Sequence, residues 1–329
     1  MTEQSSEFQN QDFAFFPPAI VLMGPTASGK SSIALEIARN LPVEIVSVDS
    51  AQVYRYMDIG TAKPDTHTMA AVPHHLINLI EPHERYSAAQ FVSDALAAMR
   101  EITARGNIPL LAGGTMLYFR ALLEGLSELP SADASLRRLI ETKAEEFGWP
   151  ALHNELLRLD PVSAARIQPT DSQRIQRALE VCHLTGKPMS EILKKPRHFY
   201  LPYRVIRIAL TPGDREILHQ RIAQRFERML EMGLIDEVRA IRDKFCLNDE
   251  SPSMRCVGYR QAWMYLDNKI SLGKMREMAL AATRQLAKRQ LTWLRPMEGI
   301  KEFDCLMENL PEHVWEYLRS TGLKAALAS

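Results

Sequence analysis

AIVLMGPTASGKSSIALEIARN, residues 19–40, combines three signals of a phosphate-binding unit. A short apolar run leads into a loop of the pattern GxxxxGK[ST], and a segment with apolar residues at helical spacing follows. In that context the glycines let backbone N–H groups and the helix N-terminus point at phosphate oxygens. Lys30 can neutralise the phosphate charge, and the Ser31 hydroxyl can bind Mg²⁺. The residues alone leave open whether the ligand is a nucleoside triphosphate or another diphosphate.

Further apolar segments predict the sheet to which this loop belongs. VEIVSVD (43–49) and IPLLAGG (108–114) are typical of buried strands, and the helical segment SAAQFVSDALAAMREITARG (87–106) lies between them. Strands that alternate with helices in this way favour a parallel, doubly wound sheet. We therefore expect an α/β fold with a P-loop NTPase-like parallel sheet core.

The character of the chain changes twice more along the sequence. After about residue 126 the pattern is nearly continuous helix, and YRVIRIAL at 203–210 resumes the α/β alternation. We therefore expect the core to be interrupted by an inserted all-helical domain. The predicted parts are a flexible N-terminal extension (1–18), a discontinuous core (19–126 and 201–315), the helical insertion (127–200) and a C-terminal tail (316–329).

Composition excludes some classes of protein and leaves others open. Hydrophobic residues make up 46% of 329, the net charge is zero, and no apolar run is long enough to span a bilayer, so a cytoplasmic protein is expected. Residues 255–295 nevertheless carry nine lysines and arginines against two acids, which suits either a polyanion or a solvated helix face. The spacing of the cysteines indicates buried reduced thiols rather than a zinc site or disulfides: Cys182, Cys246, Cys256 and Cys305.

Asp49 ends the second predicted strand and should face the ligand crevice, because the carboxyl ends of parallel strands share one edge of the sheet. A carboxylate there can hold Mg²⁺ through water, accept a proton from a nucleophile, or simply cap the next turn. The third strand ends in Gly113, Gly114 and Thr115 with no acid. That absence counts against a motor or a switch, but it leaves a small-molecule kinase open.

Seven motifs, in order from residue 20 to about 295, resemble the bacterial tRNA dimethylallyltransferase (tRNA isopentenyltransferase) family. The motifs are GPTASGKS (24–31), DSAQVYRYMDIGTAKP (49–64), GGTMLYFRALLEG (113–125), SADASLR (131–137), DSQRIQRALEV (171–181), RCVGYRQAW (255–263) and TRQLAKRQLTWLR (283–295). The resemblance implies transfer of a dimethylallyl group from its diphosphate to the exocyclic amine of the adenosine just 3′ of the anticodon. It further implies Mg²⁺, a tRNA anticodon stem-loop as partner, no membrane, a monomer, and a helical insertion that binds tRNA.

The resemblance also implies roles for individual residues. Asp49 would accept the proton of the amine, Lys30 would stabilise the leaving diphosphate, and Thr115 would contact nucleotide or diphosphate, although Thr115 also suits an ordinary helix N-cap. The diphosphate would be held by Gly24, Pro25, Thr26, Ala27, Ser28, Gly29, Lys30 and Ser31, with Ser31 as the Mg²⁺ ligand. In a helical reading of HQRIAQRFERML (219–230), Arg221 and Arg225 lie one turn apart, and we expect one of them to reach the diphosphate. The tRNA would be contacted by Asp49, Ser50, Ala51, Gln52, Thr115, Arg137, Gln173, Arg174, Ile175, Gln176, Arg177, Arg255, Cys256, Val257, Gly258, Tyr259 and Arg260.

Two other functions are compatible with the phosphate-binding loop. A small-molecule or nucleotide kinase should bind ATP more tightly than dimethylallyl diphosphate and need no RNA. A non-catalytic P-loop binding module should be unaffected by Asp49→Ala. We expect the prenyltransferase.

Overall fold

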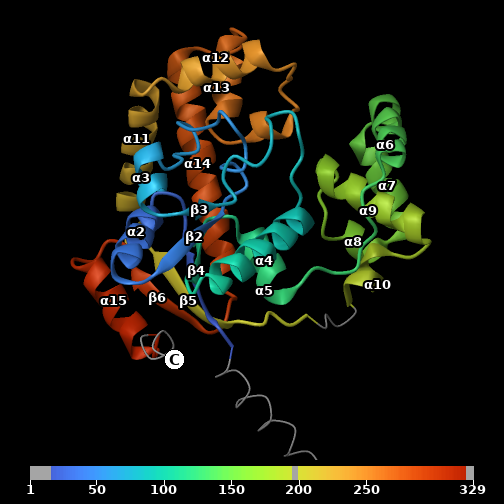
Figure 1. Cartoon of the computed structure of the whole chain (residues 1–329). Helices are drawn as coiled ribbons and strands as arrows, with labels where there is room; N and C mark the ends of the chain where they lie inside the picture. Colours follow the sequence, from blue (N-terminus) through green and yellow to red (C-terminus); the bar gives the residue numbers. More distant parts are fainter. Residues whose placement is uncertain (1–15, 195–198, 324–329) are drawn as a thin grey trace, which may run out of the picture. The chain divides into compact units, whose positions relative to one another are not determined.

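The computed structural model describes residues 16–194 and 199–323, so that most of the predicted N-terminal extension lies outside the described residues (Figure 1). The chain forms two compact units. The first comprises residues 1–122 and 201–329, and the second comprises residues 123–200. Within the described residues, no helix combines the length and the apolar character that a membrane span requires.

The first unit is built on one parallel sheet of six strands, which confirms the predicted α/β class. Its strands lie in the order β3 (His74–His75), β2 (Val43–Val48), β4 (Ile108–Gly113), β1 (Pro18–Met23), β5 (Arg204–Thr211) and β6 (Ile300–Asp304). The four central strands are those that the apolar runs predict. The sequence does not predict the two edge strands, because β3 has only two residues and β6 reads IKEFD, in which three of the five residues are charged.

Helices cover the sheet, and each of them buries one apolar side. On one face, α2 (Lys30–Asn40) and α15 (Leu310–Ser320) form a single hydrophobic cluster with alternate residues of β1, including Ile20 and Leu22. The helix α4 (Ala88–Ala104) packs on β2 and β4, and Phe91 of α4 stacks on Tyr118 of α5 (Met116–Glu124). A short helix, α3 (Thr66–Ala71), precedes β3.

The predicted C-terminal tail from residue 316 is wrong at its start. The helix α15 continues to Ser320, and Leu310, Val314 and Leu318 are buried in the core. Their spacing of four residues places them on one helix face, and this periodicity extends the core past residue 315. Residues 324–329 lie outside the described residues.

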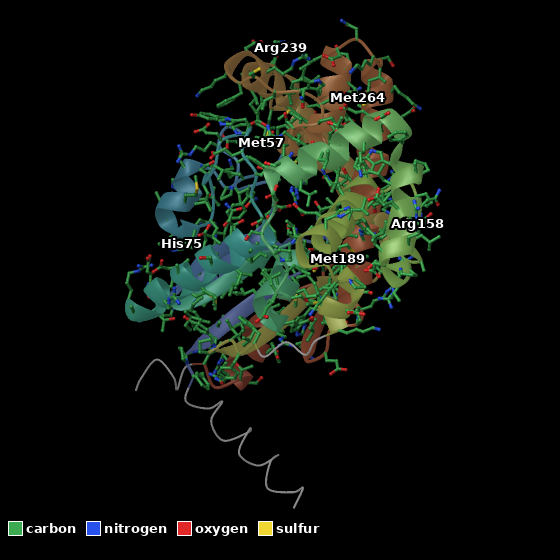
Figure 2. The ribbon with its side chains drawn as sticks, turned by 90° about the vertical axis from the view of Figure 1, so that its right-hand side faces the viewer. Met57, His75, Arg158, Met189, Arg239 and Met264 are labelled. Atoms are coloured by element: carbon green, nitrogen blue, oxygen red, sulfur yellow. The ribbon has the colours of Figure 1, made fainter. Side chains whose placement is uncertain are left out.

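A second hydrophobic cluster of this unit joins its C-terminal helices to the segment that follows β2. It includes Met57, Tyr259 and Trp263, and Figure 2 labels Met57 there. The elements are α11 (Arg215–Glu231), α12 (Leu234–Lys244), the 3₁₀ turn η2 (Pro252–Arg255), α13 (Tyr259–Leu266) and α14 (Leu272–Leu294). This cluster fixes the segment 53–57 against helices that are about 200 residues away in the sequence.

In the second unit, all the regular structure of the described residues, 123–194 and 199–200, is helical. Its helices are α6 (Ala134–Phe147), α7 (Trp149–Leu159), α8 (Pro161–Ala164), α9 (Ser172–Thr185) and α10 (Met189–Lys194). They pack around their own core, which includes Leu156, Ile175 and Leu179, and Met189 of α10 packs against it. Figure 2 labels Arg158 of α7 and Met189 of α10. The unit begins at Leu123, whereas the sequence suggested a boundary at 127.

Candidate active site

The phosphate-binding loop lies between β1 and α2, and two of its glycines are required by geometry. A Cβ atom on Gly24 would lie 2.6 Å from the carbonyl oxygen of Leu210, so only glycine fits against β5. Gly29 adopts φ 84° at the N-cap of α2, in the left-handed region that glycine favours. Within the described chain no side chain caps this helix, which leaves its first N–H groups for a ligand.

Lys30 lies in an environment that disfavours its charge. Its Nζ donates to the carbonyl oxygen of Pro25 at 2.6 Å. Burial, and secondly the positive charge of Arg225, lower the pKa of Lys30 to about 7, while Asp49 opposes the shift. An anion in the loop would therefore strongly stabilise the charged form of this lysine.

Asp49 and Thr115 follow the neighbouring strands β2 and β4, and β4 adjoins β1, which leads into the phosphate-binding loop. The Oδ1 atom of Asp49 accepts from the backbone N–H of Ala51 at 2.8 Å and of Gln52 at 3.4 Å, so this carboxylate does cap the turn. The Oγ1 atom of Thr115 accepts from the N–H of Ser50 at 3.0 Å, which links the two strand ends. All three elements therefore meet at one edge of the sheet.

One cavity of about 680 Å³, wholly within the first unit, lies at this edge. Among its lining residues are Thr26, Lys30 and Ser31 from the loop and Thr115 after β4. The other predicted site residues that line it are Asp49, Ser50, Ala51, Gln52, Arg225, Arg255, Cys256, Val257, Gly258 and Tyr259. The structure therefore brings together predicted residues from five separate segments of the chain.

The two candidate arginines of α11 have different surroundings. Arg225 lines the cavity, and burial lowers the pKa of its guanidinium while Asp49 opposes the shift. Arg221 instead donates to the carbonyl oxygen of Cys305 at 3.2 Å. The helical spacing of one turn could not distinguish the two residues, because their difference arises from a contact with the segment after β6.

The predicted RNA-contacting residues of the second unit also separate into two groups. Arg137 forms two hydrogen bonds, at 2.8 and 3.1 Å, with the carboxylate of Glu180, whose side chain is fully buried, and Arg177 pairs with the same carboxylate. These charge-assisted bonds lower the pKa of Glu180 against the opposing effect of burial. Ile175 is itself fully buried, so it is a core residue and not a surface contact.

The remaining residues of the two motifs that are predicted to contact RNA are more accessible. Gln173 and Arg174 are exposed on α9, with Arg174 3.5 Å from Asp171, and Gln176 donates to Glu141 at 2.9 Å. In the first unit Arg255 and Arg260 are exposed, and Arg255 pairs with Glu250.

Gln290 of α14 is a residue of the site that the sequence did not single out. Its Oε1 accepts from the N–H of Thr26 at 2.8 Å, and its Nε2 donates to the carbonyl oxygen of Gly114 at 2.9 Å. It therefore connects the phosphate-binding loop to the turn that carries Thr115. The motif TRQLAKRQLTWLR contains this glutamine, but the sequence gives no sign of its two partners.

Two further features of the site concern possible metal ligands and the four cysteines. Within the described chain, no cluster of three or more His, Cys, Asp or Glu side chains could hold a metal ion. The four cysteines are free thiols. Cys182 and Cys305 are buried as expected, but Cys246 is exposed and Cys256 is half-buried, so the expectation of buried thiols was wrong for these two.

A parallel sheet, a phosphate-binding loop and an acid and a hydroxyl at adjacent strand ends together define a P-loop enzyme of the group-transfer class. Residues 52–297 match the family model described as IPP transferase, and residues 18–79 match the model described as isopentenyl transferase. The chain belongs to the tRNA dimethylallyltransferase family, as the seven motifs predicted.

Curated relatives and solved structures cover nearly the whole chain. The tRNA dimethylallyltransferase of Nitrosospira multiformis is 72% identical over 94% of this chain and 96% of its own length. That of Nitrosomonas europaea is 64% identical over 93% and 97%. The crystal structure of the tRNA isopentenylpyrophosphate transferase of Bacillus halodurans is similar with a TM-score of 0.68 and 35% identity, covering 94% and 97%. A eukaryotic dimethylallyltransferase acting on tRNA has a TM-score of 0.78 at 26% identity, covering 94% and 80%.

Proposed function

We propose that the protein transfers the dimethylallyl group of dimethylallyl diphosphate to the 6-amino group of the adenosine 3′-adjacent to the anticodon, and releases diphosphate. The observation that carries this proposal is the single cavity in which Lys30, Arg225 and Asp49 meet. The two cations can bind the negatively charged diphosphate, and the carboxylate can accept the proton that leaves the amine. Family membership supports the choice of this donor and this acceptor.

The loop and its neighbours would stabilise the leaving group. As the bond between the allylic carbon and the diphosphate oxygen breaks, negative charge grows on the diphosphate. Backbone N–H groups at the start of α2, Lys30 and Arg225 are fixed around the place where that charge develops, and such fixed electrostatics usually contribute most to the rate. Ile222, Phe226 and Met229 of α11 line the same cavity and offer apolar contact to a five-carbon chain.

Asp49 would act on the acceptor. The new bond forms between the amine nitrogen and the allylic carbon, and the nitrogen then gives its proton to the carboxylate. Two backbone N–H groups orient the Asp49 side chain, so the carboxylate is held ready before the base arrives. To reach the cavity the adenine must leave the anticodon-loop stack, which costs least in a single-stranded loop.

The residues also fit a magnesium ion. The Ser31 hydroxyl and the Asp49 carboxylate both line the cavity, and hard oxygen ligands together with diphosphate oxygens are what Mg²⁺ prefers. We propose Ser31 as the direct ligand. When bound, the ion would supply further positive charge against the leaving diphosphate.

The tRNA would be bound by exposed cations on both units. Arg174 on α9, Arg255 and Arg260 are exposed, and they lie in the two motifs that the family resemblance assigns to RNA. The excess of basic residues in 255–295 supports the same assignment. We propose a monomer that acts on tRNA in the cytoplasm.

Incubation with labelled dimethylallyl diphosphate, Mg²⁺ and unmodified tRNA, followed by nucleoside analysis, tests the function. We expect label in a dimethylallyladenosine at the position 3′ of the anticodon, and none when that adenosine is replaced by guanosine. Label-free tRNA, together with consumption of ATP in a parallel incubation to which ATP is added, would support a kinase and overturn the proposal.

A further inference from the structure

The loop 57–63 forms part of the cavity wall, because Gly60, Thr61 and Ala62 line it. One carboxylate, that of Glu237 on α12, holds this loop through three successive backbone N–H groups. Its Oε2 accepts from Asp58 at 2.9 Å and from Ile59 at 2.7 Å, and its Oε1 accepts from Gly60 at 3.2 Å. The hydroxyl of Tyr259 donates to the same Oε1 at 2.5 Å.

The loop has little freedom to take another shape while these contacts persist. The ring of Tyr259 is fully buried, and a Cβ atom on Gly60 would lie 2.4 Å from it. At the far end, the Nζ of Lys63 donates to the carbonyl oxygen of Tyr54 at 2.8 Å and to the Asp58 carboxylate at 2.6 Å. Ala62 adopts φ 48°, a strained value for a residue with a side chain, so the surrounding contacts must maintain it.

The shape of the loop is transmitted to Gln52. The carbonyl oxygens of Thr61 and Ala62 both lie 3.4 Å from the Nε2 of Gln52, which donates to them. The Ser47 hydroxyl donates to the Oε1 of Gln52 at 2.8 Å. Gln52 lines the cavity three residues after Asp49, the residue that the proposed function assigns to the acceptor amine.

The phosphate-binding loop is supported by other contacts. Gln290 of α14 holds Thr26, and Leu210 of β5 adjoins Gly24. Gln290 also donates to the carbonyl oxygen of Gly114, so α14 supports the phosphate-binding loop and the turn that follows β4. The loop 57–63 is held separately, by Glu237 of α12.

We propose that Glu237 is a positioning residue for the acceptor base: it fixes the loop 57–63, and through it Gln52, in the shape into which the target adenine fits. This inference rests on the proposed function, because it assigns one wall of the cavity to the acceptor. Glu237 acts through the loop and through Gln52. Its loss should weaken use of the acceptor RNA more than binding of dimethylallyl diphosphate.

The test compares Glu237→Gln with Asp236→Asn. Both changes remove one negative charge from the same turn of α12, but Asp236 is exposed and pairs only with Arg239 among the contacts of the described chain. Glutamine has a single acceptor oxygen and cannot satisfy three N–H groups and a phenol. We expect E237Q to raise the KM for an anticodon stem-loop RNA by about tenfold or more, as small misplacements at a site can.

Two further measurements separate positioning from general damage. The Kd for dimethylallyl diphosphate, measured by calorimetry, should stay within about twofold of the wild-type value. Hydrogen exchange of a peptide covering 55–63 should become faster in E237Q and stay unchanged in D236N. Equal losses for donor and acceptor, or unchanged exchange, would overturn the inference.

Tyr259→Phe keeps the inference testable if E237Q does not fold. It removes one of the four hydrogen bonds and should give a smaller rise in the acceptor KM with donor binding intact. An acceptor KM equal to that of the wild type would overturn the inference. Failure of the wild-type protein to transfer the group at all would instead overturn the proposed function.

Discussion

The Asp49 carboxylate caps a turn and, in the proposed function, also accepts the proton of the amine. Its Oδ1 atom caps the turn at Ala51 and Gln52, and the side chain also lines the cavity beside the Lys30 ammonium. A carboxylate that only caps a turn has no need of a cation beside it, whereas Asp49 interacts with the charge of Lys30. The capped carboxylate is oriented by the backbone and therefore loses little freedom when it receives a proton.

Asp49→Asn separates these purposes. The amide oxygen can still accept from the two backbone N–H groups, but the side chain can no longer take a proton. We expect the rate of the chemical step to fall by about two orders of magnitude or more, with tRNA affinity within a few-fold of the wild type. Single-turnover kinetics and filter binding measure the two quantities. A parallel loss of rate and affinity would show that Asp49 binds the acceptor and is not the base.

The lowered pKa of Lys30 should make the affinity for the diphosphate depend on pH. In the free protein, burial lowers its pKa to about 7. A bound diphosphate should raise that pKa toward the ordinary lysine value, so binding takes up a proton above pH 7, and affinity falls as the pH rises through that region. Calorimetry at pH 8 in two buffers of different ionisation enthalpy should reveal the uptake. Lys30→Met should bind more weakly and lack it, and equal uptake in this variant would contradict the assignment.

The sequence could not predict contacts between residues that are far apart along the chain. The P-loop pattern and the position of Asp49 at a strand end were readable, because both depend on neighbouring residues. Gln290 and Glu237 were not, since their partners are 264 and about 178 residues away. Arg137 could not be recognised as the partner of buried Glu180 for the same reason.

At the scale of elements, hydrophobic pattern determined what could be predicted. The strands β1, β2 and β4 are largely apolar runs with continuous burial, and such runs are typical of parallel sheets. In β5 the continuous burial is confined to residues 208–210. The edge strand β6 escapes this rule because solvent covers part of it and only Phe303 is buried. The helix α9 was predicted, but the pattern could not tell which of its arginines face solvent.

Within α9, Arg174 and Arg177 should respond differently to alanine. Arg177 pairs with buried Glu180, so Arg177→Ala leaves a buried carboxylate with fewer donors and should destabilise the helical unit by roughly 2 kcal/mol. Arg174→Ala should leave stability nearly unchanged and lower the salt slope of log tRNA affinity by somewhat under about one. Thermal unfolding and binding over a range of salt measure the two effects. The reverse assignment of effects would contradict the roles proposed here.

At the scale of the whole molecule, each unit has its own core. The clusters around Ile20 and Met57 belong to the first unit, and the cluster around Leu179 belongs to the second. The chain leaves the first unit at Leu122, within the last turn of α5, and returns to it at Leu201, shortly before β5. Every residue that lines the cavity of about 680 Å³ is in the first unit.

Replacing residues 127–200 with a short Gly/Ser linker should therefore separate donor binding from RNA binding. The sheet and the phosphate-binding loop keep all their core contacts, so the shortened protein should bind dimethylallyl diphosphate with Mg²⁺ within a few-fold of wild-type affinity. It should lose most of its affinity for tRNA, because Gln173 and Arg174 are removed. Calorimetry with the donor and filter binding with tRNA give the two values. A shortened protein that folds and binds tRNA as tightly as the full chain would show that the RNA is held by the first unit, through residues such as Arg255 and Arg260.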